Sequence, residues 1–160
     1  DQWDERYPTR ELLETDVASG SLWVAVQDGV PVGVAAASDE WEPAYGEVRW
    51  EVDGTALYVH RLAVSPAARR RGIAAELVGQ IEREACLRGY DAVRLDAFVK
   101  NRASLALYRK RGYREAGRVR FRKGEFIALE WRVDRESNHG SGRTRGRAQA
   151  RPGRRKGTTR

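Results

Sequence analysis

Residues 64–74 read VSPAARRRGIA, where an apolar strand ends, a short turn follows and a helix begins at Gly72. The first backbone amides of a helix lack partners within the helix, and the helix dipole makes that end electropositive. Gly72 and Ala74 leave the backbone open to a bulky anion, and three consecutive arginines add positive charge. The stretch therefore predicts a cradle for phosphate groups. A helix that begins at a glycine beside solvated arginines is the plainer alternative.

Two well-known phosphate motifs do not fit this cradle. The P-loop ends in Gly-Lys-Ser/Thr, and residues 64–74 contain no lysine. The dinucleotide fingerprint needs three spaced glycines, whereas this stretch has Gly72 alone. The cradle therefore belongs to neither class of nucleotide site.

The strand that leads into the cradle changes phase midway. Leu57 and Val59 are apolar at odd positions, whereas Leu62 and Val64 are apolar at even positions. Successive side chains of a strand point to opposite faces, so one inserted residue near His60 explains the change. The pattern predicts a β-bulge, which bends a strand away from its neighbour and frees backbone groups.

The helix from Gly72 to Gly89 is the clearest element, because apolar residues recur every four positions from Ile73 onward. Its charged residues 82–84 are expected to face outward. The other expected elements are a helix at 9–19, strands at 22–26 and 30–36 joined at Asp28-Gly29, an edge strand at 48–52, strands at 57–64 and 93–99, a short helix at 103–111, and a hairpin of 113–121 with 125–133.

A second segment, NRASLALYRKRGY at residues 101–113, follows the cradle at a distance of about thirty residues. The two segments, in this order, resemble the Gcn5-related N-acetyltransferase (GNAT) family. The Arg/Gln-x-x-Gly-x-Gly/Ala signature of that family matches Arg69, Gly72 and Ala74, and its second signature matches Asn101, Leu107-Tyr108 and Gly112-Tyr113.

The resemblance implies an α+β fold with a mixed sheet whose central parallel strands splay apart at the bulge. It implies that the pantetheine of acetyl-coenzyme A lies in this gap and that its pyrophosphate lies on the cradle. The residues implied to contact the coenzyme are Leu62, Ala63, Val64, Arg69, Arg70, Arg71, Gly72, Ile73, Ala74, Ala75, Asn101 and Tyr108. Family members usually begin with a strand and a helix before the segment that resembles residues 3–20, and we expect both to be missing here.

Acetyl transfer to an amine needs a neutral nucleophile, a polarised thioester carbonyl and a proton for the leaving thiolate. In the family, the tyrosine at the position of Tyr108 points toward the coenzyme A sulfur, so Tyr108 is the candidate acid. In acetyltransferases that act on ribosomal-protein N-termini, a glutamate at the position of Asp96 serves as the general base, so Asp96 is a candidate base. A surface ion pair between Asp96 and Arg94 is the alternative. His60 and Glu51 are further candidate proton acceptors.

Three of these residues also have purely structural interpretations. Tyr108 can serve as packing on a short helix, His60 as a structural histidine of its strand, and Asn101 as a helix N-cap. The sequence leaves both interpretations open for each residue.

The positive charge is concentrated at the end of the 160-residue chain. Residues 134–160 hold nine basic and two acidic residues, which account for the whole formal net charge of +7. Few apolar residues occur there, so we expect a disordered basic tail after one domain at 1–133. A solvated extension and weak, non-specific contact with nucleic acid both fit such a tail.

The remaining composition excludes several classes of protein. A single cysteine, Cys86, excludes an internal disulfide, and no metal-ligand spacing occurs, so we expect no metal. No apolar run approaches the ~20 residues that span a bilayer, and no signal peptide opens the chain, which favours a cytoplasmic location without membrane contact. A homodimer is left open.

The resemblance implies an N-acetyltransferase that moves an acetyl group from acetyl-CoA to a primary amine of a small molecule, peptide or protein, by direct attack in a ternary complex. The acidic residues of 38–54 either attract a cationic acceptor or form a solvated loop. The alternative function is a non-catalytic acyl-CoA-binding module, or a nucleic-acid-associated protein that acts through its basic tail.

Overall fold

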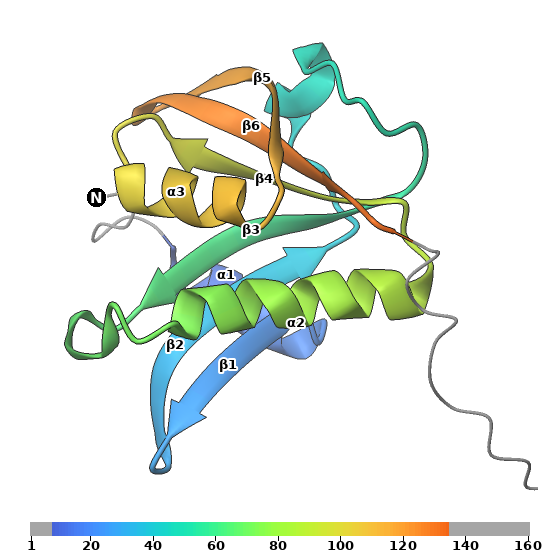
Figure 1. Cartoon of the computed structure of the whole chain (residues 1–160). Helices are drawn as coiled ribbons and strands as arrows, with labels where there is room; N and C mark the ends of the chain where they lie inside the picture. Colours follow the sequence, from blue (N-terminus) through green and yellow to red (C-terminus); the bar gives the residue numbers. More distant parts are fainter. Residues whose placement is uncertain (1–7, 135–160) are drawn as a thin grey trace, which may run out of the picture.

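The computed structural model describes residues 8–134. Within this range, a six-stranded mixed sheet in the order β1-β2-β3-β4-β6-β5 is covered by helices on both faces (Figure 1). The elements in chain order are α1 (Arg10–Ala18), β1 (Leu22–Gln27), β2 (Val30–Ser38), the 3₁₀ helix η1 (Pro43–Glu47), β3 (Ala56–Val64), the 3₁₀ helix η2 (Pro66–Ala68), α2 (Ile73–Arg88), β4 (Ala92–Phe98), α3 (Arg102–Lys110), β5 (Arg114–Phe121) and β6 (Gly124–Arg132). The predicted α+β class with a mixed sheet is confirmed.

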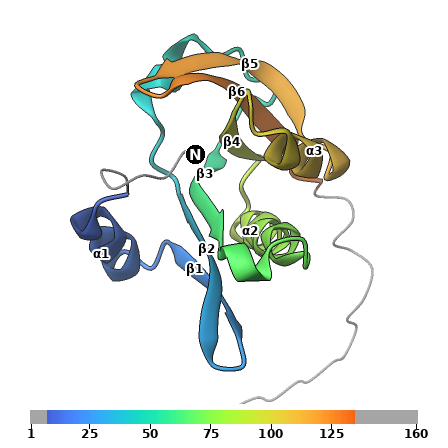
Figure 2. The ribbon, with the colours of Figure 1, turned by 90° about the vertical axis from the view of Figure 1, so that its left-hand side faces the viewer.

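The sheet separates two layers of different character (Figure 2). Helices α2 and α3 lie on one face, over an apolar core that includes Leu57, Ile81 and Leu95. Helix α1 and the segment between β2 and β3 lie on the other face, where Tyr45 and Phe126 belong to a smaller aromatic cluster. Each face of the sheet therefore has its own set of covering residues.

The predicted bulge lies in β3 at His60. Ala36 of β2 pairs with Arg61, but Ala37 pairs with Val59, so His60 has no partner in the register. Strand β3 pairs with its parallel neighbour β4 only from Ala56 to Val59. The two strands separate beyond the bulge, as expected for an inserted residue.

Two adjacent pairs of strands continue past the point of separation. Strand β2 follows β3 as far as Val64, and β6 follows β4 as far as Phe98. The sheet is therefore split into two halves that share only the short β3–β4 contact at one end.

The predicted edge strand at 48–52 is wrong, because these residues form no strand. The Glu130 carboxylate instead accepts hydrogen bonds from the backbone N–H groups of Glu51 (2.9 Å) and Val52 (3.0 Å). The Arg94 guanidinium donates to the Val52 carbonyl at 2.6 Å. Side chains thus satisfy the backbone groups that a neighbouring strand would otherwise have to satisfy.

Two expectations about charged residues are also wrong. Arg94 does not pair with Asp96; it is buried and pairs with Glu130 at 2.9 Å. Glu82 does not face solvent, since only 8% of its surface is exposed. It accepts two hydrogen bonds from the Arg111 guanidinium, which ties α2 to the end of α3.

We expect Arg94→Leu to lower the free energy of unfolding by about 3–5 kcal/mol, because it leaves the Glu130 carboxylate buried without a cation. Urea unfolding followed by circular dichroism measures the change. Arg118→Leu is the matched control: its ion pair with Glu125 is exposed, and it should cost less than about 1 kcal/mol. Equal effects of the two substitutions would contradict the importance assigned to the buried pair.

Candidate active site

A cleft of about 970 Å³ opens where β3 and β4 separate. Its walls come from β2, from β3 and the turn after it, from the first turn of α2, and from the chain between β4 and α3. Six of the twelve residues that the resemblance assigns to the coenzyme line this cleft: Leu62, Ala63, Val64, Arg69, Ala74 and Asn101. The fold therefore brings predicted residues that are nearly forty positions apart in the sequence together in one cleft.

The cradle lies at one end of the cleft. Gly72 is the N-cap of α2, with φ of 82° and no side-chain cap, and a Cβ atom there would meet nothing within 4 Å. Arg70 also has a positive φ, of 61°. Arg69, Arg70 and Arg71 are exposed and form no ion pair with any residue between 8 and 134. The uncapped amides and free guanidinium groups are suited to a phosphate anion.

The middle of the cleft is apolar. Leu62 and Val64 of β3 lie across from Phe98 and Leu107. Beyond Val59, one edge of β3 faces the gap instead of β4. The cleft thus combines a slender apolar channel with unpaired strand edge, which suits a chain that carries both amides and methylene groups.

Tyr108 lies on the helix side of the sheet and, like Asp96 and His60, is not among the residues that line the cleft. It lies in α3, only 4% of its surface is exposed, and its ring contacts Tyr113 with centroids 5.5 Å apart. Burial, together with the nearby charge of Asp96, raises the pKa of the Tyr108 phenol above its ordinary value. The phenol therefore keeps its proton at neutral pH, as a proton donor must.

Asp96 lies on the other face of the sheet, opposite to α2 and α3. It follows Leu95, the last residue of β4 that pairs with β3, and so lies where the gap begins. The Tyr45 hydroxyl donates to Asp96 Oδ2 at 2.6 Å. Burial raises the pKa of the Asp96 carboxyl, the hydrogen bond from Tyr45 lowers it, and the charge of Glu42 raises it. The resulting pKa is about 6. A carboxylate with this pKa is ionised at pH 7 and is a better proton acceptor than an ordinary aspartate.

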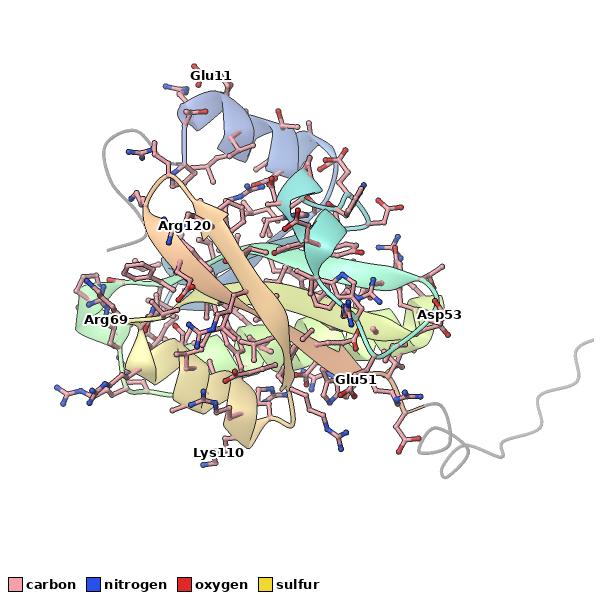
Figure 3. The ribbon with its side chains drawn as sticks, turned by 90° about the horizontal axis from the view of Figure 1, so that it is seen from above. Glu11, Glu51, Asp53, Arg69, Lys110 and Arg120 are labelled. Carbon is pink, nitrogen blue, oxygen red and sulfur yellow. The ribbon has the colours of Figure 1, made fainter. Side chains whose placement is uncertain are left out.

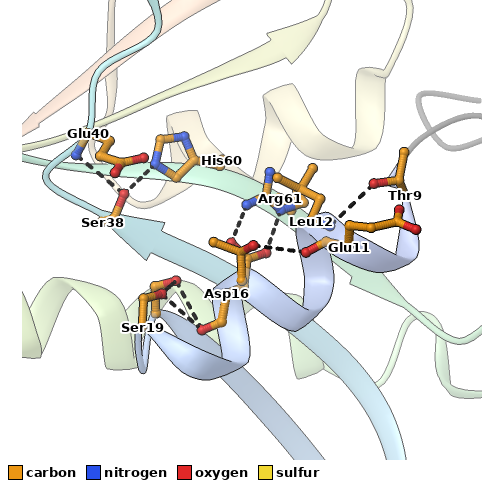
Figure 4. A network of polar contacts seen from close by, with 11 residues as sticks. Thr9, Glu11, Leu12, Asp16, Ser19, Ser38, Glu40, His60 and Arg61 are labelled. Atoms are coloured by element: carbon orange, nitrogen blue, oxygen red, sulfur yellow. Dashed lines mark hydrogen bonds and ion pairs between the residues drawn. The ribbon is translucent and has the colours of Figure 1, made fainter.

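His60 is held at the bulge by a serine (Figure 4). Its Nε2 atom lies 2.8 Å from Ser38 Oγ, which also accepts the backbone N–H of Glu40 at 3.3 Å. Burial and the adjacent Arg61 lower the pKa of His60, so its imidazole is neutral. The neighbouring Arg61 joins β3 to α1 through Asp16, with 2.8 Å between Nε and Oδ2.

Glu51 is not brought to the cleft. It is exposed, forms an ion pair with Arg114 at 3.6 Å, and lies at the opposite end of the sheet from Arg69 (Figure 3). Asn101 both lines the cleft and caps α3, since its Oδ1 atom accepts the Ser104 N–H at 3.1 Å. Its two interpretations are therefore compatible.

Sequence reasoning missed Tyr45 and Ser38, the side chains that contact the two candidate bases. Tyr45 belongs to η1, within a polar stretch that has no strand or helix periodicity. The sequence contains no signal that places this loop against β4, because the contact depends on how the chain crosses the sheet.

No helix between residues 8 and 134 has the length and apolar character needed to cross a bilayer. Within the same range, no group of three or more potential metal ligands occurs.

Comparisons with known proteins give a consistent result. The sequence model of the acetyltransferase (GNAT) family matches residues 1–113. N-acetyltransferase 8F1 of Rattus norvegicus is 30% identical over 140 residues, which cover 82% of this chain and 57% of the relative. Three such curated relatives are covered over 57%, 54% and 53% of their lengths, so the chain spans about half of each.

Solved structures resemble the chain over most of its length. The GNAT family acetyltransferase from Streptococcus agalactiae superimposes with a TM-score of 0.70 and 28% identity, over 83% of this chain and 76% of that chain. Arabidopsis thaliana NAA60 in complex with acetyl-CoA gives a TM-score of 0.64 and 20% identity, over 79% and 87% of the two chains. Because the identity with NAA60 is only 20%, this similarity shows a shared fold alone.

The raised pKa of Asp96 has a consequence for stability. A carboxyl whose folded pKa is about 6 instead of 3.8 favours the folded state at low pH, and this contribution is lost as the pH rises through 6. Asp96→Asn keeps an acceptor for Tyr45 but cannot ionise. The loss takes place between the two pKa values, so part of it is already complete at pH 5. We expect the variant to gain about 1.4 kcal/mol of stability over the wild type between pH 5 and pH 8, the equivalent of the remaining pKa unit. Thermal melts at both pH values measure this, and a constant difference between the two proteins would contradict it.

Proposed function

Because the chain belongs to the acetyltransferase (GNAT) family, we propose that it transfers the acetyl group of acetyl-coenzyme A to a primary amine by direct attack in a ternary complex. One observation carries the proposal: the buried Tyr108 and the Asp96 carboxyl of raised pKa lie on opposite faces of β4, and Asp96 follows the last residue of β4 that pairs with β3. A separate acid and base are what amine attack on a thioester requires.

The cleft on the helix side fits coenzyme A. The uncapped amides after Gly72 and the free side chain of Arg69 would hold the pyrophosphate. The β3 edge at Leu62 and Val64 would bind pantetheine through backbone hydrogen bonds. When bound, the coenzyme supplies an activated thioester carbonyl.

The protein's own groups would then move the protons. An amine is mostly ammonium at neutral pH, and the Asp96 carboxylate would accept its proton, directly or through a water molecule. As the amine nitrogen bonds to the carbonyl carbon, the carbon–sulfur bond breaks. The Tyr108 phenol would give its proton to the departing sulfur, and the proton that the nitrogen loses on becoming an amide would return to the phenol through water. A backbone N–H freed at the bulge near His60 would stabilise the developing oxyanion.

The acceptor is proposed only by class, as a primary amine of a small molecule, a peptide or a protein. It would approach from the face that carries α1 and the segment between β2 and β3, because the coenzyme would fill the helix side. A cytoplasmic location, a homodimer and a nucleic-acid contact remain predictions. The predicted domain limit at residue 133 also remains a prediction, and the predicted basic tail lies, apart from Asp134, outside the described residues.

The first test measures thiol release from acetyl-CoA with spermidine, kanamycin, a peptide with a free N-terminal alanine, and an N-terminally blocked lysine peptide. We expect turnover with at least one of them, and a loss of kcat of about 100-fold in Tyr108→Phe. Tyr90→Phe is the control, because Tyr90 is a half-buried tyrosine just after α2 whose ring contacts Arg88, whereas Tyr108 lies near the charge of Asp96. Binding of acetyl-CoA without turnover of any amine would favour a non-catalytic acyl-CoA-binding module.

The second test concerns the cradle. Ala74→Asp places a carboxylate on the cleft wall, where it repels phosphate but suits the first turn of a helix. We expect calorimetry to give a Kd for coenzyme A at least about tenfold weaker, which corresponds to about 1.4 kcal/mol. Ala106→Asp adds the same charge at an exposed position of α3 outside the cleft and should leave the Kd unchanged. Equal affinity in both variants would contradict the assigned pyrophosphate site.

A further inference from the structure

We propose that Tyr45 is a positioning residue of the acceptor half of the site: it holds the Asp96 carboxylate so that one oxygen remains directed to the incoming amine. This inference rests on the proposed function, because it assigns a role to a neighbour of the proposed base. It goes beyond that function by making the loop between β2 and β3 part of the proton-transfer machinery.

The two oxygens of the Asp96 carboxylate differ in their hydrogen bonds. Asp96 Oδ2 accepts the Tyr45 hydroxyl at 2.6 Å, a short distance typical of a hydrogen bond to an anion. Among residues 8–134, no donor hydrogen-bonds to the other oxygen, Oδ1. One oxygen is therefore fixed by the protein, and the other is left for an amine or a water molecule.

Aromatic contacts hold the Tyr45 ring in place. Its ring is buried, stacks on Tyr58 with centroids 6.0 Å apart, and meets the edge of Trp50 at 5.5 Å. The guanidinium of Arg94 lies 4.7 Å from the Trp50 ring centroid and pairs with Glu130. An ion pair in the sheet thus supports an aromatic stack, and the stack aims one phenol at Asp96.

Tyr45 reaches Asp96 from a distant part of the chain. It lies 51 positions from Asp96, in the 3₁₀ helix η1, which begins at Pro43. The backbone N–H of Tyr45 donates to the Glu42 carbonyl at 2.8 Å. The orientation of the proposed base therefore depends on a loop of the acceptor face and not only on β4.

The charged and titratable groups around Asp96 determine the expected pH dependence. Tyr45 and Glu42 approach from the loop and Tyr108 approaches from α3. Arg94 and its partner Glu130 lie farther along the same face of β4 and β6 and compensate each other. Of these groups, Tyr45 stabilises the ionised carboxylate and Glu42 opposes it. Loss of the Tyr45 hydroxyl should therefore make Asp96 harder to ionise.

The experiment compares Tyr45→Phe with Tyr90→Phe in the full chain, using acetyl-CoA and the best acceptor of the four amines named above. Both substitutions remove a phenol oxygen and keep the ring, but Tyr90 follows α2, where its ring lies 5.2 Å from the Arg88 guanidinium, and it has no hydrogen bond to Asp96. For Tyr45→Phe we expect kcat to fall about tenfold or more, with an unchanged KM for acetyl-CoA. The rising limb of the pH–rate profile should move to higher pH. Tyr90→Phe should change neither kcat nor the limb.

The outcomes separate this inference from the proposed function. If the wild type is active and the two variants behave alike, the positioning role is overturned while the proposed function stands. An active wild type without a rising limb near pH 6, or with one that survives in Asp96→Asn, would also overturn it. If the wild type transfers acetyl to none of the amines, the proposed function falls and the positioning role falls with it. An NMR titration of Asp96 gives a second readout: its pKa should rise in Tyr45→Phe and not in Tyr90→Phe.

Discussion

The separation of β3 from β4 is the constraint on which the rest of the molecule depends. Parallel strands normally stay in register along their length, because each leaves the other's backbone groups unsatisfied if it moves away. Here the unpaired His60 bends β3, so that pairing stops at Val59. On their outer sides the two strands remain hydrogen-bonded, because β2 and β6 continue beside them. The cost of unpaired backbone is thus confined to one gap, and this gap is the place where a ligand can supply the missing hydrogen bonds.

The segment between β2 and β3 shows how a loop can be fixed without secondary structure. Glu130 and Arg94, both buried, bind its backbone at Glu51 and Val52. A buried ion pair alone often adds little to stability, since desolvation offsets the attraction. This pair gains additional hydrogen bonds to the loop, and in return it determines where Tyr45 lies. Packing on this face therefore connects the interior of the sheet to the acceptor side of the site.

The sequence predicts the local features of this protein well and its long-range contacts poorly. The bulge, the helix caps at Gly72 and Gly89 and the hairpin at Asp28-Gly29 depend on neighbouring residues, and they occur as predicted. Residues 48–52 alternate like a strand but form none, because the competing partner, Glu130, is almost eighty positions away. The prediction that Glu82 faces outward is wrong for the same reason, since its partner Arg111 lies at the end of another helix.

The candidate site follows the same division. Signature residues such as Ala74 and Asn101 were predicted because they recur at fixed spacing, and both line the cleft. Tyr45 could not be predicted, since only the folded chain places it against β4.

The two faces of β4 also explain why the proposed acid and the proposed base need not compete for the same space. Tyr108 lies on the helix side and Asp96 on the other side, and burial raises the pKa of both. The negative charge of Asp96 helps to keep Tyr108 protonated. A phenol therefore keeps its proton on one face while a carboxylate can form on the other. Because the cleft proposed for the coenzyme lies on the helix side, Asp96 does not share that cleft. This arrangement accords with the proposed direct attack in a ternary complex.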